Sequence, residues 1–157
     1  MDTVGGLRAV VPEALHATLC FLGWRSVTDI QDIGAACADA VDGLATPELA
    51  FTDALWLPRR RPRVLAAGLE DRSGALAQVQ AALSAALAAG GWYAPETRPF
   101  LAHVTVARVA GRARVKPVKL GRLESADFGG AAVTLYRSRL ERGGARYEPL
   151  RRIEFSS

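Results

Sequence analysis

Histidine, cysteine and lysine are scarce in this chain of 157 residues, which contains two of each. Cys20 and Cys37 form no CxxC pair and no metal-ligand grouping, which argues against a disulfide-rich secreted domain and a zinc ribbon. Long apolar runs are also absent: none approaches the roughly 20 residues that span a bilayer. Residues 1–6 lack the basic start of a secretory signal. We therefore expect a cytoplasmic protein with no membrane partner and with reduced cysteines.

Acidic residues are outnumbered, so the formal net charge is +4 and the pI is about 9.6. Arginine supplies nearly all the positive charge, since Lys116 and Lys119 are the only lysines. Guanidinium groups bind phosphates in a bidentate manner, so an anionic partner such as RNA is one interpretation. The other is a general bias of composition, because alanine, glycine and arginine are abundant together.

The apolar pattern predicts a single domain over 1–157, built from two small lobes. One helix is expected to start at a capping box in Thr28–Gln31, with an apolar stripe of Ile30, Ile33, Cys37, Val41 and Leu44. A second covers Ser73–Ala89 and stops at Gly90, with an apolar stripe of Leu76, Val79, Leu83 and Leu87. Strands are predicted over 7–12, 15–22, 48–57, 62–70, 101–109, 131–140 and 146–155. Tight turns join several of these strands, which favours antiparallel sheets and an α+β class.

Both histidines occur in the same short pattern, His-x-Thr, inside a predicted strand. Residues i and i+2 of a strand project from one face. His16 therefore points with Thr18, and His103 with Thr105. If the two strands lie side by side, two imidazoles and two hydroxyls converge on one spot.

Such a group of side chains suits phosphodiester chemistry. Histidines ordinarily titrate near neutral pH, so one can act as a base and the other as an acid. Hydroxyls can donate hydrogen bonds to the phosphate oxygens, whose charge builds in the transition state. Opening a cyclic phosphodiester requires one proton to leave the nucleophile and one to reach the leaving alcohol.

Two other interpretations apply to the histidines. A single His-x-Thr in a strand is usually structural, although two copies that use every histidine of the chain favour a shared site. A zinc site is the second, but no carboxylate or thiolate stands at ligand spacing and no HExxH occurs. We therefore expect no metal.

The segments "HATLCFLG" and "RPFLAHVTVAR" resemble the paired HxT signatures of the 2H phosphoesterases, and in particular the LigT-like RNA 2',3'-cyclic phosphodiesterases, also called 2'-5' RNA ligases. The resemblance extends to "RRPRVLAAGLE" and "LYRSRLERGGARYEPL", and so covers most of residues 12–155. It implies a bilobal, pseudo-two-fold α+β fold of two antiparallel sheets with flanking helices and a central cleft. The first strand and helix of that family have no counterpart ahead of Gly6, so this unit is expected to be missing.

The resemblance also implies roles for the motif residues. His16 and His103 are the expected catalytic residues, with His16 as the acid and His103 as the base, and Thr18 and Thr105 are the expected phosphate binders. The implied reaction opens 2',3'-cyclic phosphate ends of RNA to 2'-phosphates without metal or cofactor, and runs in reverse as ligation in some members. Two alternatives stay open: a small nucleotide substrate such as an ADP-ribose cyclic phosphate, and a non-catalytic RNA-binding module. A monomer is expected, although the short N-terminus leaves oligomerisation open.

Four further residues are candidate substrate contacts: Arg98, Arg108, Phe21 and Phe100. Strict alternation puts Arg108 on the face away from His103, so its contact with substrate requires a twist or an end of the strand there. Arg98 lies in the segment that leads into the predicted strand over 101–109. Alternation puts Phe21 with Ala17 on the core face, so core packing is the favoured interpretation for Phe21 and, similarly, for Phe100.

Overall fold

The computed structural model describes residues 3–124 and 126–156, and the chain divides into two compact units. The first unit comprises the described parts of Met1–Thr18, Ala50–Glu70 and Leu101–Asp127. The second comprises Leu19–Leu49, Asp71–Phe100 and Phe128–Ser157 up to the last described residue. The described residues form two α-helices and two separate sheets, so the fold is α+β, as the sequence predicts. Among the described residues, no helix is both long and apolar enough to cross a membrane.

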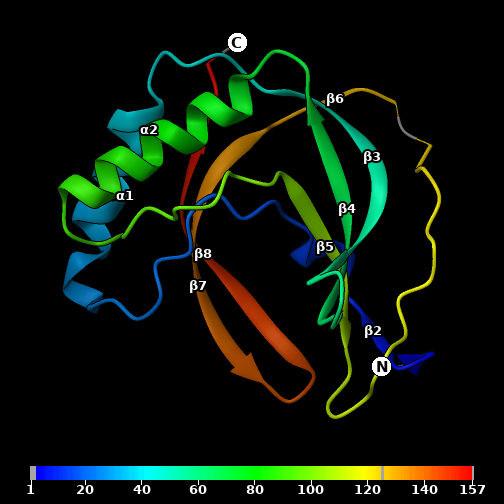
Figure 1. Ribbon diagram of the computed structural model, residues 1–157. Helices are drawn as coiled ribbons and strands as arrows, with labels where there is room; N and C mark the ends of the chain where they lie inside the picture. The colour runs from blue at the N-terminus through cyan, green and yellow to red at the C-terminus, as the bar shows by residue number, and fades with distance from the viewer. Residues whose placement is uncertain (1–2, 125, 157) are drawn as a thin grey trace. The chain divides into compact units, whose positions relative to one another are not determined.

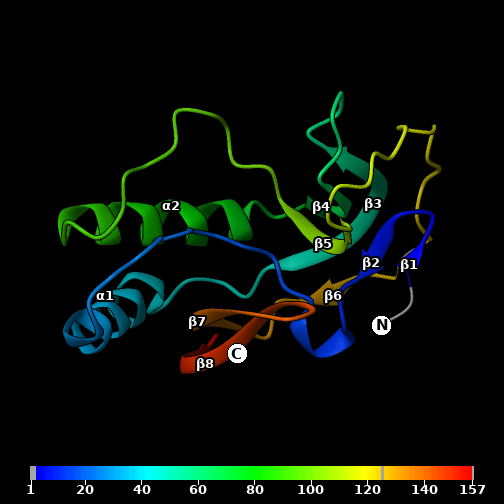
Figure 2. The same ribbon diagram turned by 90° about the horizontal axis from the view of Figure 1, so that it is seen from below.

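The first unit is built on a sheet whose strands follow the order β1-β2-β5-β4-β3 (Figures 1 and 2). These strands are β1 (Thr3–Val4), β2 (Leu7–Ala9), β5 (His103–Val109), β4 (Val64–Asp71) and β3 (Glu48–Leu57). β5 is antiparallel to both of its neighbours, β2 and β4. It lies in the interior of the sheet, so its residues are held from two sides.

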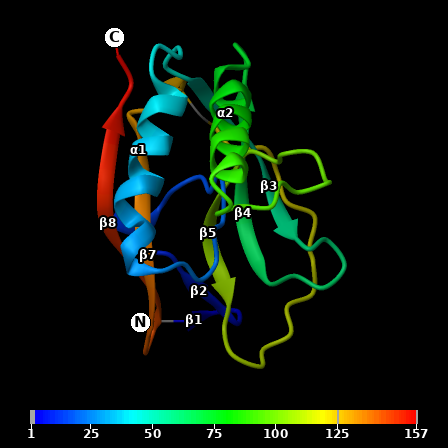
Figure 3. The same ribbon diagram turned by 90° about the vertical axis from the view of Figure 1, so that its left-hand side faces the viewer.

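The second unit packs two helices against each other, α1 (Ile30–Val41) and α2 (Ala75–Ala89) (Figure 3). Its other elements are the hairpin of β7 (Ala132–Glu141) and β8 (Gly144–Glu154), and the short β6 (Phe128–Gly129), which pairs with Glu48 and Leu49. The core contains the predicted helical stripes and one strand residue: Ile33, Cys37, Val41, Val79, Leu83, Leu87 and Val133. The two stripes are confirmed because each faces the other helix.

The start of the first helix differs from the predicted capping box. A 3-10 turn, η2 (Val27–Asp29), precedes α1, so Thr28 lies inside this turn and is not the N-cap. The capping hydroxyl is that of Ser26, which accepts a hydrogen bond from the backbone N–H of Thr28 at 3.3 Å. The same hydroxyl chemistry thus caps the turn two residues earlier than expected.

The predicted strand over 15–22 is wrong, and the strand over 7–12 is shorter than expected. β2 ends at Ala9, and a 3-10 turn, η1 (Pro12–Ala14), follows. Only Ala17 of the 15–22 segment makes a sheet contact, a single antiparallel bridge to Val104. The chain then leaves the first unit, the sheet unit, and enters the second, the helical unit. There Leu19, Cys20 and Leu22 are partly buried against the core.

Candidate active site

The two HxT motifs lie next to each other in the first unit. The second motif lies at the start of β5. The first motif pairs with β5 at Val104, on the same side of β5 as β2, which pairs with residues 107–109. Ala17 faces Val104 in an antiparallel bridge. This register places His16 across from Thr105 and Thr18 across from His103, all four on the face opposite to Ala17 and Val104.

The bridge gives the four side chains a crossed arrangement. Residues directly across an antiparallel pair have Cβ atoms about 4.5–5.5 Å apart, and diagonal neighbours are about 7–8 Å apart. The two histidines occupy one diagonal and the two threonines the other. A phosphate between the imidazoles can therefore be approached from opposite sides by two proton-transfer groups, with a hydroxyl beside each.

The 3-10 turn η1 positions the first histidine. Pro12 begins the turn with its fixed φ, and Leu15 N–H donates to the Pro12 carbonyl at 3.1 Å, which closes it. The turn carries the chain from the end of β2 to the bridge at Ala17 and leaves the carbonyl of Ala14 turned toward His16. This carbonyl lies 2.7 Å from Nδ1 of His16.

His103 makes the matching contact, since its Nδ1 lies 2.8 Å from the carbonyl oxygen of Leu101. A carbonyl oxygen can only accept, so in both rings Nδ1 carries the proton and donates it. Nε2 is then the nitrogen that gains or loses a proton in each ring. Both imidazoles are half-buried and are held in the same tautomer by a carbonyl two residues earlier.

A β-bulge in β5 changes the face of Arg108. Leu65 pairs with Ala107 and Ala66 pairs with Thr105, so Val106 is an extra residue on β5. The alternation therefore restarts beyond Val106. Arg108 pairs with Val64, which is on the same face of β4 as Ala66, and so on the face of Thr105 and His103. The expectation from strict alternation, which puts Arg108 on the other face, is wrong because of this bulge.

Gly68 of β4 pairs with His103 and leaves room for the side chain of Thr52, which comes from the neighbouring strand β3. A Cβ on Gly68 would lie 2.6 Å from Oγ1 of Thr52 and 3.3 Å from the backbone oxygen of Asp53. The side chain of Thr52 therefore approaches the backbone of β4 on the face of the sheet that carries His16 and His103, which we call the histidine face. This close approach leaves no sign in the sequence, because it depends on which strands pair with β4.

The other candidate contacts, Phe21, Arg98 and Phe100, belong to the helical unit. Phe21 is 77% exposed, so the core packing favoured for it is wrong: the strand on which that alternation relied is not formed. Arg98 is exposed, with its Nη2 3.7 Å from Oε2 of Glu96. Phe100 is half-buried.

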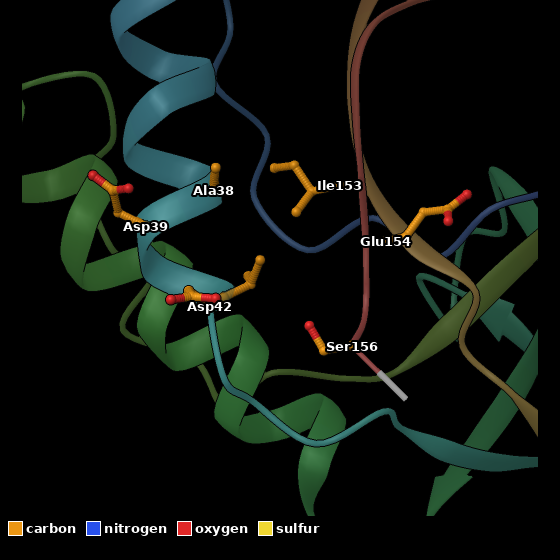
Figure 4. Close-up of a pocket in the computed structure, with 7 residues that line it drawn as sticks. Ala38, Asp39, Asp42, Ile153, Glu154 and Ser156 are labelled. Atoms are coloured by element: carbon orange, nitrogen blue, oxygen red, sulfur yellow. The ribbon is translucent and has the colours of Figure 1, made fainter.

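A hollow of about 270 Å³ lies in the helical unit, between the end of α1 and the end of β8 (Figure 4). Its lining includes the side chains of Asp39, Asp42 and Glu154. Three carboxylates repel a phosphate, so this hollow does not suit a phosphodiester. Over residues 3–124 and 126–156, no three histidine, cysteine, aspartate or glutamate side chains are grouped so that they could hold a metal ion.

Comparison with known proteins finds a relative whose name states its reaction. An RNA 2',3'-cyclic phosphodiesterase of Aeropyrum pernix is 30% identical to this chain over 156 residues, which cover 96% of this chain and 88% of that protein. No protein-family model matches the chain.

Solved structures share the fold. The protein TT0787 of Thermus thermophilus superposes with a TM-score of 0.80 at 23% identity, over 96% of this chain and 82% of that one. LigT of E. coli, in a complex with 3'-AMP, superposes with a TM-score of 0.74 at 27% identity, over 98% of this chain and 83% of that one. From the curated relative, together with the two adjacent HxT motifs, we conclude that this chain belongs to the LigT-like 2H phosphoesterase family and is a phosphodiesterase.

Proposed function

We propose that this protein opens the 2',3'-cyclic phosphate at the end of an RNA and leaves a 2'-phosphomonoester. The observation that carries the proposal is the pairing of Ala17 with Val104, which brings both histidines and both threonines to one face of one sheet. The similar protein of Aeropyrum pernix is named for this reaction on RNA. The excess of arginine suits a polyanionic substrate.

The reaction needs one base and one acid, and both come from Nε2 atoms. Neutral His103 accepts a proton from water as the water oxygen bonds to phosphorus. The bond between phosphorus and the 3' oxygen breaks, and protonated His16 gives its Nε2 proton to that oxygen. The products are a 2'-phosphate and a free 3' hydroxyl. With the 5' hydroxyl of a second RNA in place of water, the same two proton transfers open the ring and join the two RNAs through a 2'-5' bond.

The threonines bind the phosphate in this proposal. The hydroxyls of Thr18 and Thr105 donate to its non-bridging oxygens, which become more negative in the transition state. Arg108, brought to this face by the bulge, contacts the substrate next to them. Phe21, Phe100 and Arg98 are retained as candidate contacts for the nucleoside, Phe21 because its ring is 77% exposed.

The decisive experiment measures turnover of an oligoribonucleotide with a 2',3'-cyclic end in the presence of EDTA. The intact protein should convert it to the 2'-phosphate. His16→Ala and His103→Ala should each lower kcat by about 10²–10⁴-fold, the usual contribution of a general acid or base.

Gln78→Ala, an exposed substitution on α2, is the matched control and should keep full activity. Unchanged thermal unfolding of the two histidine variants shows that the loss is chemical. Full turnover by either histidine variant would contradict the mechanism, and a 3'-phosphate product would reverse the assignment of the leaving oxygen.

A further inference from the structure

Arg8 and Arg108 face each other directly across the β2–β5 pair. Because Arg108 lies on the face of His103 and Thr105, Arg8 lies on that face too. Arg8 is half-buried and Arg108 is exposed. The face that carries the two HxT motifs thus continues into a pair of guanidinium groups from adjacent strands.

The pairing of Arg8 with Arg108 is electrostatically unfavourable unless an anion binds to the two guanidinium groups. Like charges directly across an antiparallel pair destabilise it, with Cβ atoms about 4.5–5.5 Å apart. The ion pairs within the described residues include neither Arg8 nor Arg108. The neighbour of Arg108 on the other side is Val64, which offers no charge. Two planar donors side by side match the oxygens of a phosphate, which each can bind in a bidentate manner.

The distance from the HxT motifs identifies which phosphate fits. On β4, Ala66 pairs with Thr105 and Val64 pairs with Arg108, so the partners of Thr105 and Arg108 are two residues apart on that strand. At 3.3–3.4 Å per residue, they are separated by about 7 Å along the sheet. This is of the order of the spacing between successive phosphates of one nucleic-acid strand.

We propose that Arg8 and Arg108 form a second phosphate site, which binds the phosphodiester on the 5' side of the terminal nucleotide. This inference rests on the proposed function and names its substrate class: oligonucleotides with a cyclic phosphate end rather than cyclic mononucleotides. A nucleoside 2',3'-cyclic phosphate without a 5'-phosphate leaves the second site empty.

The test compares kcat/KM for 2',3'-cyclic AMP with that for the dinucleotide ApA ending in a 2',3'-cyclic phosphate. Arg8→Gln should lower the value for the dinucleotide by about 10-fold, the effect of losing a charge-assisted hydrogen bond. It should leave the value for 2',3'-cyclic AMP within about twofold. Arg142→Gln, which removes an exposed arginine at the β7–β8 turn, is the control for net charge and should change neither value.

A neutral linkage makes the test sharper. When a methylphosphonate replaces the internal phosphodiester of the dinucleotide, the unaltered enzyme should lose at least about 10-fold in kcat/KM, because both arginines lose their anion. Arg8→Gln should have the same kcat/KM as the unaltered enzyme on this neutral dinucleotide. An equal loss on the mononucleotide and the dinucleotide, or an additive loss with the methylphosphonate, would overturn the second site.

Binding without turnover separates this inference from the proposed function. An oligoribonucleotide ending in a 2'-phosphate should bind Arg8→Gln more weakly, and the slope of log K against log salt should fall by about 1. If this happens while no cyclic phosphate is hydrolysed, the proposed function fails and the second site stands. If Arg8→Gln binds this probe with unchanged affinity and salt slope, the second site fails whatever the enzyme hydrolyses.

Discussion

At the scale of single residues, the two histidines share one local arrangement despite different backbone surroundings. His16 follows a 3-10 turn and His103 begins a strand, yet each Nδ1 donates to a carbonyl two residues earlier. In the proposed mechanism, fixing the proton on Nδ1 leaves Nε2 as the nitrogen that transfers protons in both rings. The near symmetry of the site follows from this repeated contact together with the bridge at Ala17.

The hydroxyls of Thr18 and Thr105 should contribute to the rate by donating hydrogen bonds to the negatively charged phosphate, and not through the shape of the side chain. Thr18→Val and Thr105→Val keep the branched side chain but remove the donor, so each should lower kcat by about 10²-fold while leaving thermal unfolding unchanged. Thr→Ser at the same positions should restore most of the rate in a turnover assay. Thr97→Val, at an exposed residue of the helical unit, should have no effect. A rate unaffected by both valine variants would show that the hydroxyls do not bind the reacting phosphate.

At the scale of elements, the course of β5 decides what the site contains. The bulge at Val106 turns Arg108 onto the histidine face, and the pairing with β4 brings Gly68 beside His103. A glycine is needed at position 68 because Thr52 occupies the space of a side chain there.

Gly68→Ala tests this close approach. The new methyl group must displace Thr52, so we expect the variant to lose about 1–3 kcal/mol of unfolding free energy and to have a lower kcat/KM. Adding Thr52→Ala removes the nearest obstructing atom and should restore part of the stability, as measured by urea denaturation, while the backbone oxygen of Asp53 stays in place. Gly121→Ala is the matched control, because a Cβ there meets nothing within 4 Å. If Gly68→Ala is as stable and active as the unaltered protein, Thr52 does not occupy that space.

At the scale of the whole molecule, the two histidines and the two cysteines lie in different units. The histidine face belongs to the sheet unit, whereas both cysteines lie at the core of the helical unit. Burial raises the pKa of the Cys20 thiol to about 11, with a further contribution from Cys37, while a hydrogen bond with Tyr93 acts against it. The pKa of the Cys37 thiol is also raised by burial.

These shifts predict a loss of stability in alkali. The ordinary pKa of the thiol is 9.0 and the folded value for Cys20 is about 11. Between these values the folded chain holds more protons than the unfolded chain, so the free energy of unfolding should fall as the pH rises from about 9 to about 11, having been constant below. Urea denaturation at a series of pH values measures this. The Cys20→Ala variant should show a shallower decline, and an equal decline would assign the effect to other groups, Tyr93 among them.

Features that depend on local periodicity follow from the sequence alone. The stripes of Ile33, Cys37 and Val41 and of Val79 and Leu83 are buried as predicted, since helical spacing presents one face whatever the surroundings. The hairpin of β7 and β8 also forms where strands are predicted over 131–140 and 146–155. The HxT pairs were recognisable for the same reason: i and i+2 share a face wherever a chain is extended.

Tertiary structure decided everything that depends on which strands are neighbours. Three features follow from pairing between segments far apart in the chain: the bulge that moves Arg108, the partner of Arg8 and the approach of Thr52 to Gly68. One extra residue in one strand reverses the face of every residue beyond it. Such a shift leaves no mark in the sequence of that strand, because the hydrogen bonds that set it come from its partners.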